Sequence, residues 1–112
     1  MICETTAYFK FILPCKYSEL ASVQITFWQD HYFGPAANRR LPIVKQLIHC
    51  LHTENDNEIA VVLTSEETAR FATTRKAYVL FQATTIEGSR FSHKKKTIDV
   101  YPAYDGPTPI TE

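Results

Sequence analysis

Residues 78–101 have the sequence YVLFQATTIEGSRFSHKKKTIDVY, and this stretch predicts more about the fold than any other part of the chain. Its beginning, residues 78–87, is rich in aromatic and β-branched side chains, which favour a strand. Strand-like alternation resumes at residues 96–101. The loop between them, residues 88–95, carries much of the positive charge of the molecule. An exposed basic loop is either solvated or in contact with a partner, so it is a candidate binding site.

Length and composition limit the class of protein. A chain of 112 residues fits one domain. With 45% hydrophobic and 21% charged residues, the chain as a whole is not expected to be disordered. Lys plus Arg and Asp plus Glu both number 12, and this balance argues against a protein that coats nucleic acid through charge alone.

Cysteine usage and hydropathy indicate a compartment. Cys3, Cys15 and Cys50 are an odd number without CxxC spacing, which is typical of reduced thiols in the cytoplasm. The N-terminus lacks a basic segment followed by an apolar run. The longest apolar run, residues 59–63, is far too short to span a bilayer. We therefore expect a soluble cytoplasmic protein without a membrane partner.

Three further segments have clear patterns. Residues 5–13 predict a strand with apolar residues on both faces, and such a strand is expected to be covered on both sides. Residues 41–52 predict a helix, because Pro42 suits its first position and an apolar stripe recurs at helical spacing. The stripe consists of Leu41, Val44, Leu47, Ile48 and Leu51. Residues 58–63 predict a buried strand.

Two segments complete the expected secondary structure. Thr64 and Glu67 have the spacing of a capping box, which predicts a helix from residue 64 to about residue 76. Residues 18–33 fit a helix that begins at Ser18 and ends before Gly34-Pro35, although residues 21–27 also alternate as a strand does. The end signals favour the helix.

The expected fold class is α+β, with a mostly antiparallel sheet of four or five strands and two or three helices packed on one face. Residues 1–101 form a single domain in this interpretation. Residues 102–112 contain three prolines and one glycine, and they predict an extended tail.

Two clusters of basic residues are candidate binding sites. Arg39 and Arg40 lie just before the helix expected at Pro42, where positive charge opposes the helix dipole, so a bound anion is one explanation. Pairing with an acidic residue or simple solvation is the other. The second cluster surrounds the loop and combines cations with an aromatic ring, as nucleic-acid and acidic protein surfaces both require. It consists of Arg90, Phe91, His93, Lys94, Lys95 and Lys96.

Catalytic and metal motifs are weak. His49 and His52 are three residues apart, but a zinc site needs a third and usually a fourth ligand. Cys15 with His31 could form a nucleophile and its base, although nothing in the spacing favours that pair. The three glycines are not clustered, which excludes recognisable phosphate-binding loops. No cofactor or metal ion is expected.

These features favour a small non-enzymatic binding module that engages a protein partner through aromatic surface and the basic hairpin loop. A nucleic-acid-binding protein that uses Arg39, Arg40 and residues 90–96 is the alternative. A small enzyme that uses His31, His49 or Cys15 is the second alternative. Aromatic surface also suits a homodimer.

Overall fold

The computed structural model describes residues 1–29, 42–73 and 75–102. Eight strands lie in these residues: β1 (Ala7–Ile12), β2 (Leu20–Trp28), β3 (Ile43–Gln46), β4 (Leu51–His52), β5 (Glu58–Leu63), β6 (Ala77–Thr85), β7 (Arg90–Ser92) and β8 (Lys96–Ile98). The described helical elements are short: α2 (Ser65–Thr68) and the 3₁₀ turns η1 (Tyr17–Glu19) and η2 (Leu47–His49).

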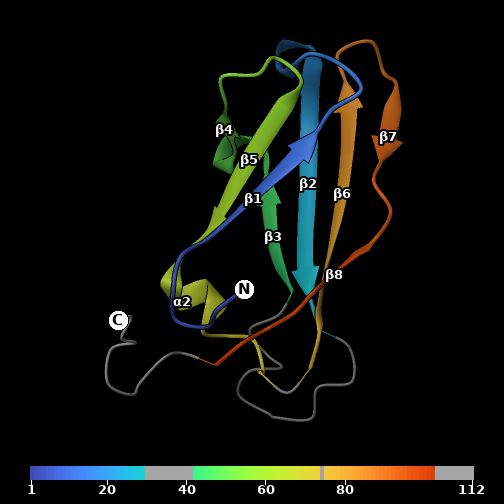
Figure 1. The fold of residues 1–112 in the computed structure, drawn as a ribbon. Coiled ribbons are helices and arrows are strands. Elements are labelled where there is room, and N and C mark those ends of the chain that lie inside the picture. Colours follow the sequence, from blue (N-terminus) through green and yellow to red (C-terminus); the bar gives the residue numbers. More distant parts are fainter. Residues whose placement is uncertain (30–41, 74, 103–112) are drawn as a thin grey trace.

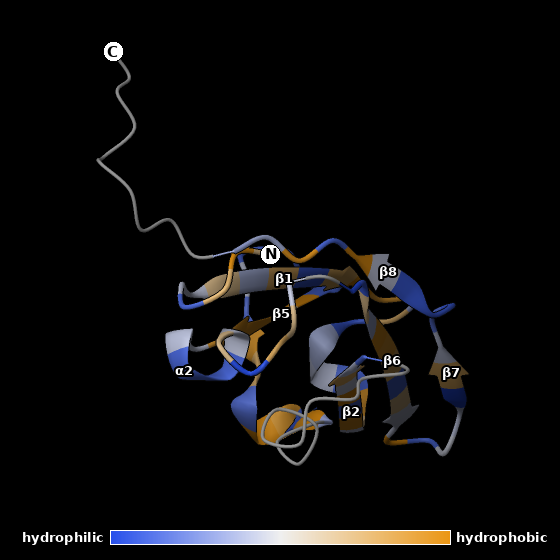
Figure 2. Cartoon of the chain, turned by 90° about the horizontal axis from the view of Figure 1, so that it is seen from below, coloured by the Kyte–Doolittle hydropathy of each residue, from blue (hydrophilic) through white to orange (hydrophobic). Residues whose placement is uncertain are grey.

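The strands form two antiparallel sheets. The three-stranded sheet has the order β1-β5-β4, and the five-stranded sheet has the order β3-β2-β6-β7, with β8 also paired to β6. The two sheets lie one in front of the other in Figure 1 and appear as separate layers in Figure 2. The described part of the chain is therefore a small β-sandwich.

Alternation along the strands places one face of each sheet in a shared core. Phe9 of β1 meets Phe27 of β2 with ring centroids 5.1 Å apart, and Phe11 stacks on Phe81 of β6 at 5.0 Å. Both contacts join one sheet to the other. The largest fully buried apolar side chains are Ile25, Phe27, Ile59, Val61, Leu63 and Phe81. Burial of these apolar surfaces is the main driving force for packing the two layers.

This architecture corrects the expected α+β class. The strands expected at residues 5–13, 58–63 and 78–87 are confirmed as β1, β5 and β6, and the strand expected at residues 96–101 is confirmed over residues 96–98, as β8. The expected layer of two or three helices is wrong, because α2 is the only α-helix among the described residues and has four residues. The second sheet takes the place that we had expected helices to occupy. The tail expected at residues 102–112 lies outside the described residues from position 103 onward.

The helix expected over residues 18–33 is wrong in its described part. Ser18 lies in the turn η1, and residues 20–28 form β2. Val23, Ile25 and Phe27 are buried, and the residues between them face outward. The alternation was therefore the correct signal. β2 pairs with β6 along almost its full length, and these cross-strand contacts outweigh the local end signals that favoured a helix.

The helix expected over residues 41–52 is also wrong. The segment forms β3, the turn η2 and β4, and it passes from one sheet to the other. The stripe that predicted a buried helical face is largely exposed, with Val44 at 43%, Ile48 at 83% and Leu51 at 48%. Ile43 is buried instead, opposite Phe27 of β2. Strand pairing therefore sets which residues of this segment enter the core.

The helix expected from residue 64 to about 76 is much shorter than expected, although its start is confirmed. Thr64 Oγ1 accepts a hydrogen bond from the Glu67 backbone N–H at 3.2 Å, and Glu67 Oε1 accepts one from the Thr64 N–H at 2.9 Å. The turn ends after Thr68, whose fully buried hydroxyl donates to the Thr5 carbonyl at 2.7 Å. In the described ranges no helix is long and apolar enough to cross a membrane.

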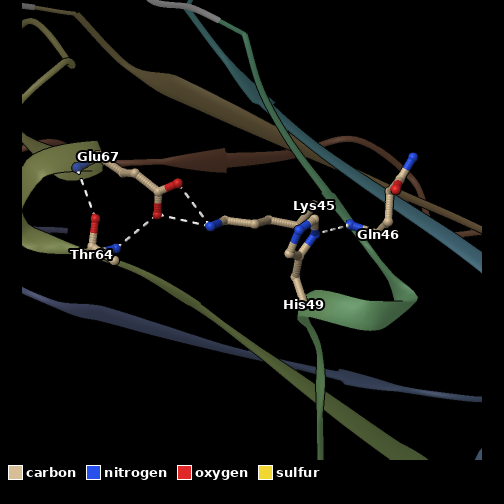
Figure 3. A network of polar contacts seen from close by, with 5 residues as sticks. All are labelled: Lys45, Gln46, His49, Thr64 and Glu67. Carbon is tan, nitrogen blue, oxygen red and sulfur yellow. Dashed lines mark hydrogen bonds and ion pairs between the residues drawn. The ribbon is translucent and has the colours of Figure 1, made fainter.

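A polar bridge joins α2 to the five-stranded sheet. Figure 3 shows the Lys45 side chain reaching from β3 to Glu67, where its Nζ lies 2.8 and 2.9 Å from the two carboxylate oxygens. The pair is largely shielded from solvent. Burial raises the pKa of Glu67, but the bonds from Lys45 and from the Thr64 N–H outweigh that effect and lower the pKa overall. The ionised carboxylate therefore stabilises the fold.

We expect Glu67→Gln to cost about 1 kcal/mol of unfolding free energy at pH 7, after allowance for solvent screening. Because the folded-state pKa lies below the ordinary value of 4.5, the contribution is fully present above that pH and is lost as the pH falls further. Urea denaturation measures this effect. The difference in unfolding free energy between the variant and the unmodified protein should be smaller below pH 4 than at pH 7. Glu66→Gln, at an exposed position of the same turn, is the control and should have little effect. A loss independent of pH would contradict the role of the charge.

Candidate binding face

The basic segment is an edge strand of the five-stranded sheet for most of its length. A tight turn joins β6 to β7, with the Thr85 N–H donating to the Ser89 carbonyl at 2.8 Å and Gly88 at a φ of 94°. This left-handed backbone favours glycine. β7 then pairs with residues 82–84 of β6, and β8 pairs with residues 77–79. The expected loop over residues 88–95 is therefore shorter than the pattern indicated.

A β-bulge interrupts this edge strand. Gln82 pairs with Ser92 and Val79 pairs with Lys96, so three steps along β6 match four steps along the edge. The extra residue falls at Lys94-Lys95, opposite Leu80. Lysines in a bulge on a sheet edge discourage pairing with another strand. A partner is therefore better placed on the face of this sheet than along its edge.

The structure divides the predicted basic cluster into inward and outward residues. Phe91 is half-buried, and its ring centroid lies 6.0 Å from that of Phe81. His93 is also half-buried and packs edge-on against Phe81 at 5.0 Å. Its Nε2 is buried without a hydrogen-bond partner among the described residues. His93 also lies 6.1 Å from the ring of Phe11 in β1, and Phe91 packs against the hydrophobic core, so both rings support the packing of the sandwich.

The four cations of the cluster are exposed: Arg90, Lys94, Lys95 and Lys96. The ion pairs found within residues 1–29, 42–73 and 75–102 are Lys45–Glu67 and Lys76–Asp99, so none of the four is neutralised there. The Lys95 ammonium lies 4.5 Å from the centre of the Tyr78 ring. Arg39 and Arg40 lie outside the described residues, so their position relative to this cluster is not described.

The outer face of the five-stranded sheet carries a row of polar side chains next to these cations. Gln46 of β3, Gln24 of β2, Gln82 of β6 and Ser92 of β7 are successive cross-strand partners. Within the described residues, the side-chain amides of Gln24 and Gln82 make no hydrogen bond. Each amide offers two donors and one acceptor to a ligand.

A shallow groove of about 950 Å³ follows this polar row. Ser22, Thr84 and Arg90 line it near the β6–β7 turn, and Leu47 and Ile48 of η2 form the rim beyond β3. The groove therefore has an apolar rim at β3 and a guanidinium group at β7, with amides and hydroxyls between them. Sequence analysis missed it because the glutamines align only when the strand registers are known.

The charge of this sheet is one-sided. None of its five strands contains Asp or Glu. Of the cations within them, Arg90 is in register with Thr84 on the outer face, whereas Lys96 is in register with buried Val79 and Lys45 is paired with Glu67. Carboxylates occur instead beyond the strand ends: Glu19 and Glu87 line a neighbouring depression of about 520 Å³, which Arg90 lines as well, and Asp99 pairs with Lys76. An anionic group above the outer face would therefore meet Arg90 without a carboxylate from the strands beneath it.

The cysteines are poor nucleophiles. Burial is the main cause that raises the pKa of all three thiols, and the carboxylate of Glu19 raises that of Cys15 further. The pKa of Cys50 reaches about 11, and its thiol donates to the Gln46 carbonyl at 3.4 Å. The nucleophile of cysteine chemistry is the thiolate, which these environments disfavour at neutral pH.

The histidines do not form a metal site in the described part of the chain. His49 Nδ1 accepts a hydrogen bond from the Gln46 backbone N–H at 3.0 Å (Figure 3). The His52 ring stacks on Tyr17 with centroids 4.3 Å apart. No group of three or more potential metal ligands occurs in the part that the structure describes. His31, the base considered for Cys15, lies outside it.

Comparison with protein-family models, curated proteins and solved structures found no match to this chain.

Proposed function

We propose that this chain is a non-enzymatic binding module that holds an extended, acidic protein segment on the outer face of its five-stranded sheet. The single observation that carries the proposal is the groove across strands without Asp or Glu, with exposed Arg90 at one end. The unbonded amides of Gln24 and Gln82 lie between its ends and match the donors and acceptors of a peptide backbone.

The groove also defines the length and polarity of the segment. It crosses four strands, so the polar row spans about 14 Å at the usual strand spacing, the length of about four or five extended residues. An apolar side chain suits the rim at Ile48, which is 83% exposed, and a carboxylate suits Arg90. Guanidinium groups bind carboxylates with two parallel hydrogen bonds, which gives the ligand a direction.

The aromatic rings favour a protein over a nucleic acid. Bases stack on exposed ring faces. Phe91 packs inward on Phe81, and the Tyr78 ring lies against Trp28 at 5.6 Å and beneath the Lys95 ammonium. The net charge of zero also supplies little general attraction for a polyanion. We further propose a cytoplasmic location, which is supported by three cysteines that are unpaired in the structure.

Fluorescence anisotropy with a labelled hexapeptide tests the proposal. The probe has leucine at one end, two glutamates at the other and small polar residues between them. We expect the unmodified protein to bind it, and we expect Arg90→Glu to weaken binding at least about tenfold through loss of a charge-assisted pair and added repulsion. Binding should also weaken as salt rises.

Two controls make this test specific. Lys10→Glu reverses a charge on the outer face of the other sheet, and it should leave peptide affinity unchanged. A peptide with glutamines in place of the glutamates should bind the unmodified protein more weakly. Equal affinity for both peptides would overturn the acidic-segment proposal. Binding of an oligothymidylate but not of the peptide would replace it with the nucleic-acid alternative.

A further inference from the structure

The outer face of the three-stranded sheet is unusually apolar for a surface. Cross-strand pairing places Tyr8 beside Val62, Ile12 beside Glu58, and Ala60 between Lys10 and Leu51. Tyr8 is 56% exposed, Ile12 58% and Leu51 48%. The sequence predicted that residues 5–13 would be covered on both sides, and the core covers only one of them. Exposed apolar residues that gather on one face, here around Lys10, mark interaction surfaces.

The charges on this face complement each other across two neighbouring strands. Lys10 of β1 and Glu58 of β5 are diagonal neighbours, because Lys10 pairs with Ala60 and Ile12 pairs with Glu58. The Glu58 carboxylate is held in place by the Thr53 hydroxyl at 2.8 Å and the Asn55 side-chain amide at 3.2 Å. Ala60 lies between the larger side chains and is fully buried, so the middle of the face is low.

We infer that this face binds a second copy of the chain in a two-fold symmetric dimer. In such an interface the same patch is present on both sides, so a residue that contacts a second residue is contacted in return by its equivalent. One cation and one anion within an apolar patch satisfy this condition, because Lys10 of each copy can pair with Glu58 of the other. A uniformly acidic or basic partner would leave one of the two charges opposed by its own sign.

This inference is independent of the proposed peptide groove, which lies on the opposite outer face of the sandwich. Sedimentation velocity over a range of protein concentrations tests it. We expect the unmodified protein to sediment as a dimer at high concentration and to dissociate on dilution. Ile12→Lys should raise the dissociation constant at least about tenfold, because it puts a charge into the apolar patch. Lys10→Glu should also raise the dissociation constant, because the new carboxylate repels Glu58 of the second copy.

Ile86→Lys is the matched control, because Ile86 is 70% exposed in the β6–β7 turn. This variant should dimerise as the unmodified protein does. Far-ultraviolet circular dichroism checks that each variant is folded. If Ile12→Lys does not fold, the Lys10→Glu variant provides the test. A protein that remains monomeric at every concentration overturns the inference. A dimer that tolerates a folded Ile12→Lys or Lys10→Glu variant overturns it as well, because the interface then lies elsewhere.

Discussion

Phe81→Ala should lower the unfolding free energy by about 3–5 kcal/mol, the range for truncation of a buried phenylalanine. The side chain is 1% exposed and lies between Phe11 of the opposite sheet and the edge residues Phe91 and His93. Its removal therefore leaves a cavity and also takes support from the strand that carries the exposed cations. Urea denaturation with a constant m-value is the measurement.

Two control substitutions separate cavity formation from other effects. Phe81→Leu keeps most of the apolar volume and should cost clearly less than the alanine variant. Ile86→Ala removes an exposed side chain and should change stability by no more than about 0.5 kcal/mol. A loss below about 1 kcal/mol for Phe81→Ala would show that this side chain does not join the two sheets as described.

The sequence predicted an element of this fold correctly where the local pattern and the tertiary strand pairing favoured the same structure. β5 and β6 have β-branched and aromatic residues with no competing helical signal, and both were predicted. The capping box at Thr64 is a local interaction within one turn, so the start of α2 was also predictable. The length of α2 was not predictable, because the helix ends at Thr68, whose buried hydroxyl donates a hydrogen bond to the carbonyl of distant Thr5.

The segment that misled the prediction most is residues 41–52. Val44, Ile48 and Leu51 recur at helical spacing, but in the structure they face solvent on different parts of the molecule. A stripe of this kind indicates a buried helix only when the surface that would bury it exists. Here β3 is fixed by its pairing with β2, and that pairing depends on residues about twenty positions earlier.

The candidate site was predictable in part for a similar reason. The cations at residues 90–96 are evident in the sequence, but the inward direction of Phe91 and His93 follows from their pairing with β6. The polar row depends on three registers at once, since Gln24, Gln46 and Gln82 come from three strands. Single-sequence patterns report which face of one strand is polar, and they contain no information about which strands are neighbours.

Gln29→Leu should lower the unfolding free energy by about 2–4 kcal/mol, because three hydrogen bonds are lost and the half-buried N–H and carbonyl of Ala72 are left unpaired. The amide lies just after β2 and is 8% exposed. Its Nε2 donates to the carbonyls of Ala72 at 2.8 Å and Arg75 at 3.1 Å, and its Oε1 accepts from the Ala72 N–H at 2.8 Å. One side chain thus connects the five-stranded sheet to the segment between α2 and β6.

Gln82→Leu is the matched control for this change. It makes the same replacement on the outer face of the same sheet, where the amide has no hydrogen bond within the described residues, so stability should change by no more than about 0.5 kcal/mol. Hydrogen exchange adds a local readout, because the Ala72 amide should lose protection in the Gln29 variant and keep it in the control. Equal stability losses for the two variants would mean that leucine itself, and not the broken amide contacts, is responsible. The Gln82→Leu variant should also bind the acidic peptide more weakly than the unmodified protein does. The pair of variants therefore distinguishes Gln29, which stabilises the fold, from Gln82, which we assign to the binding face.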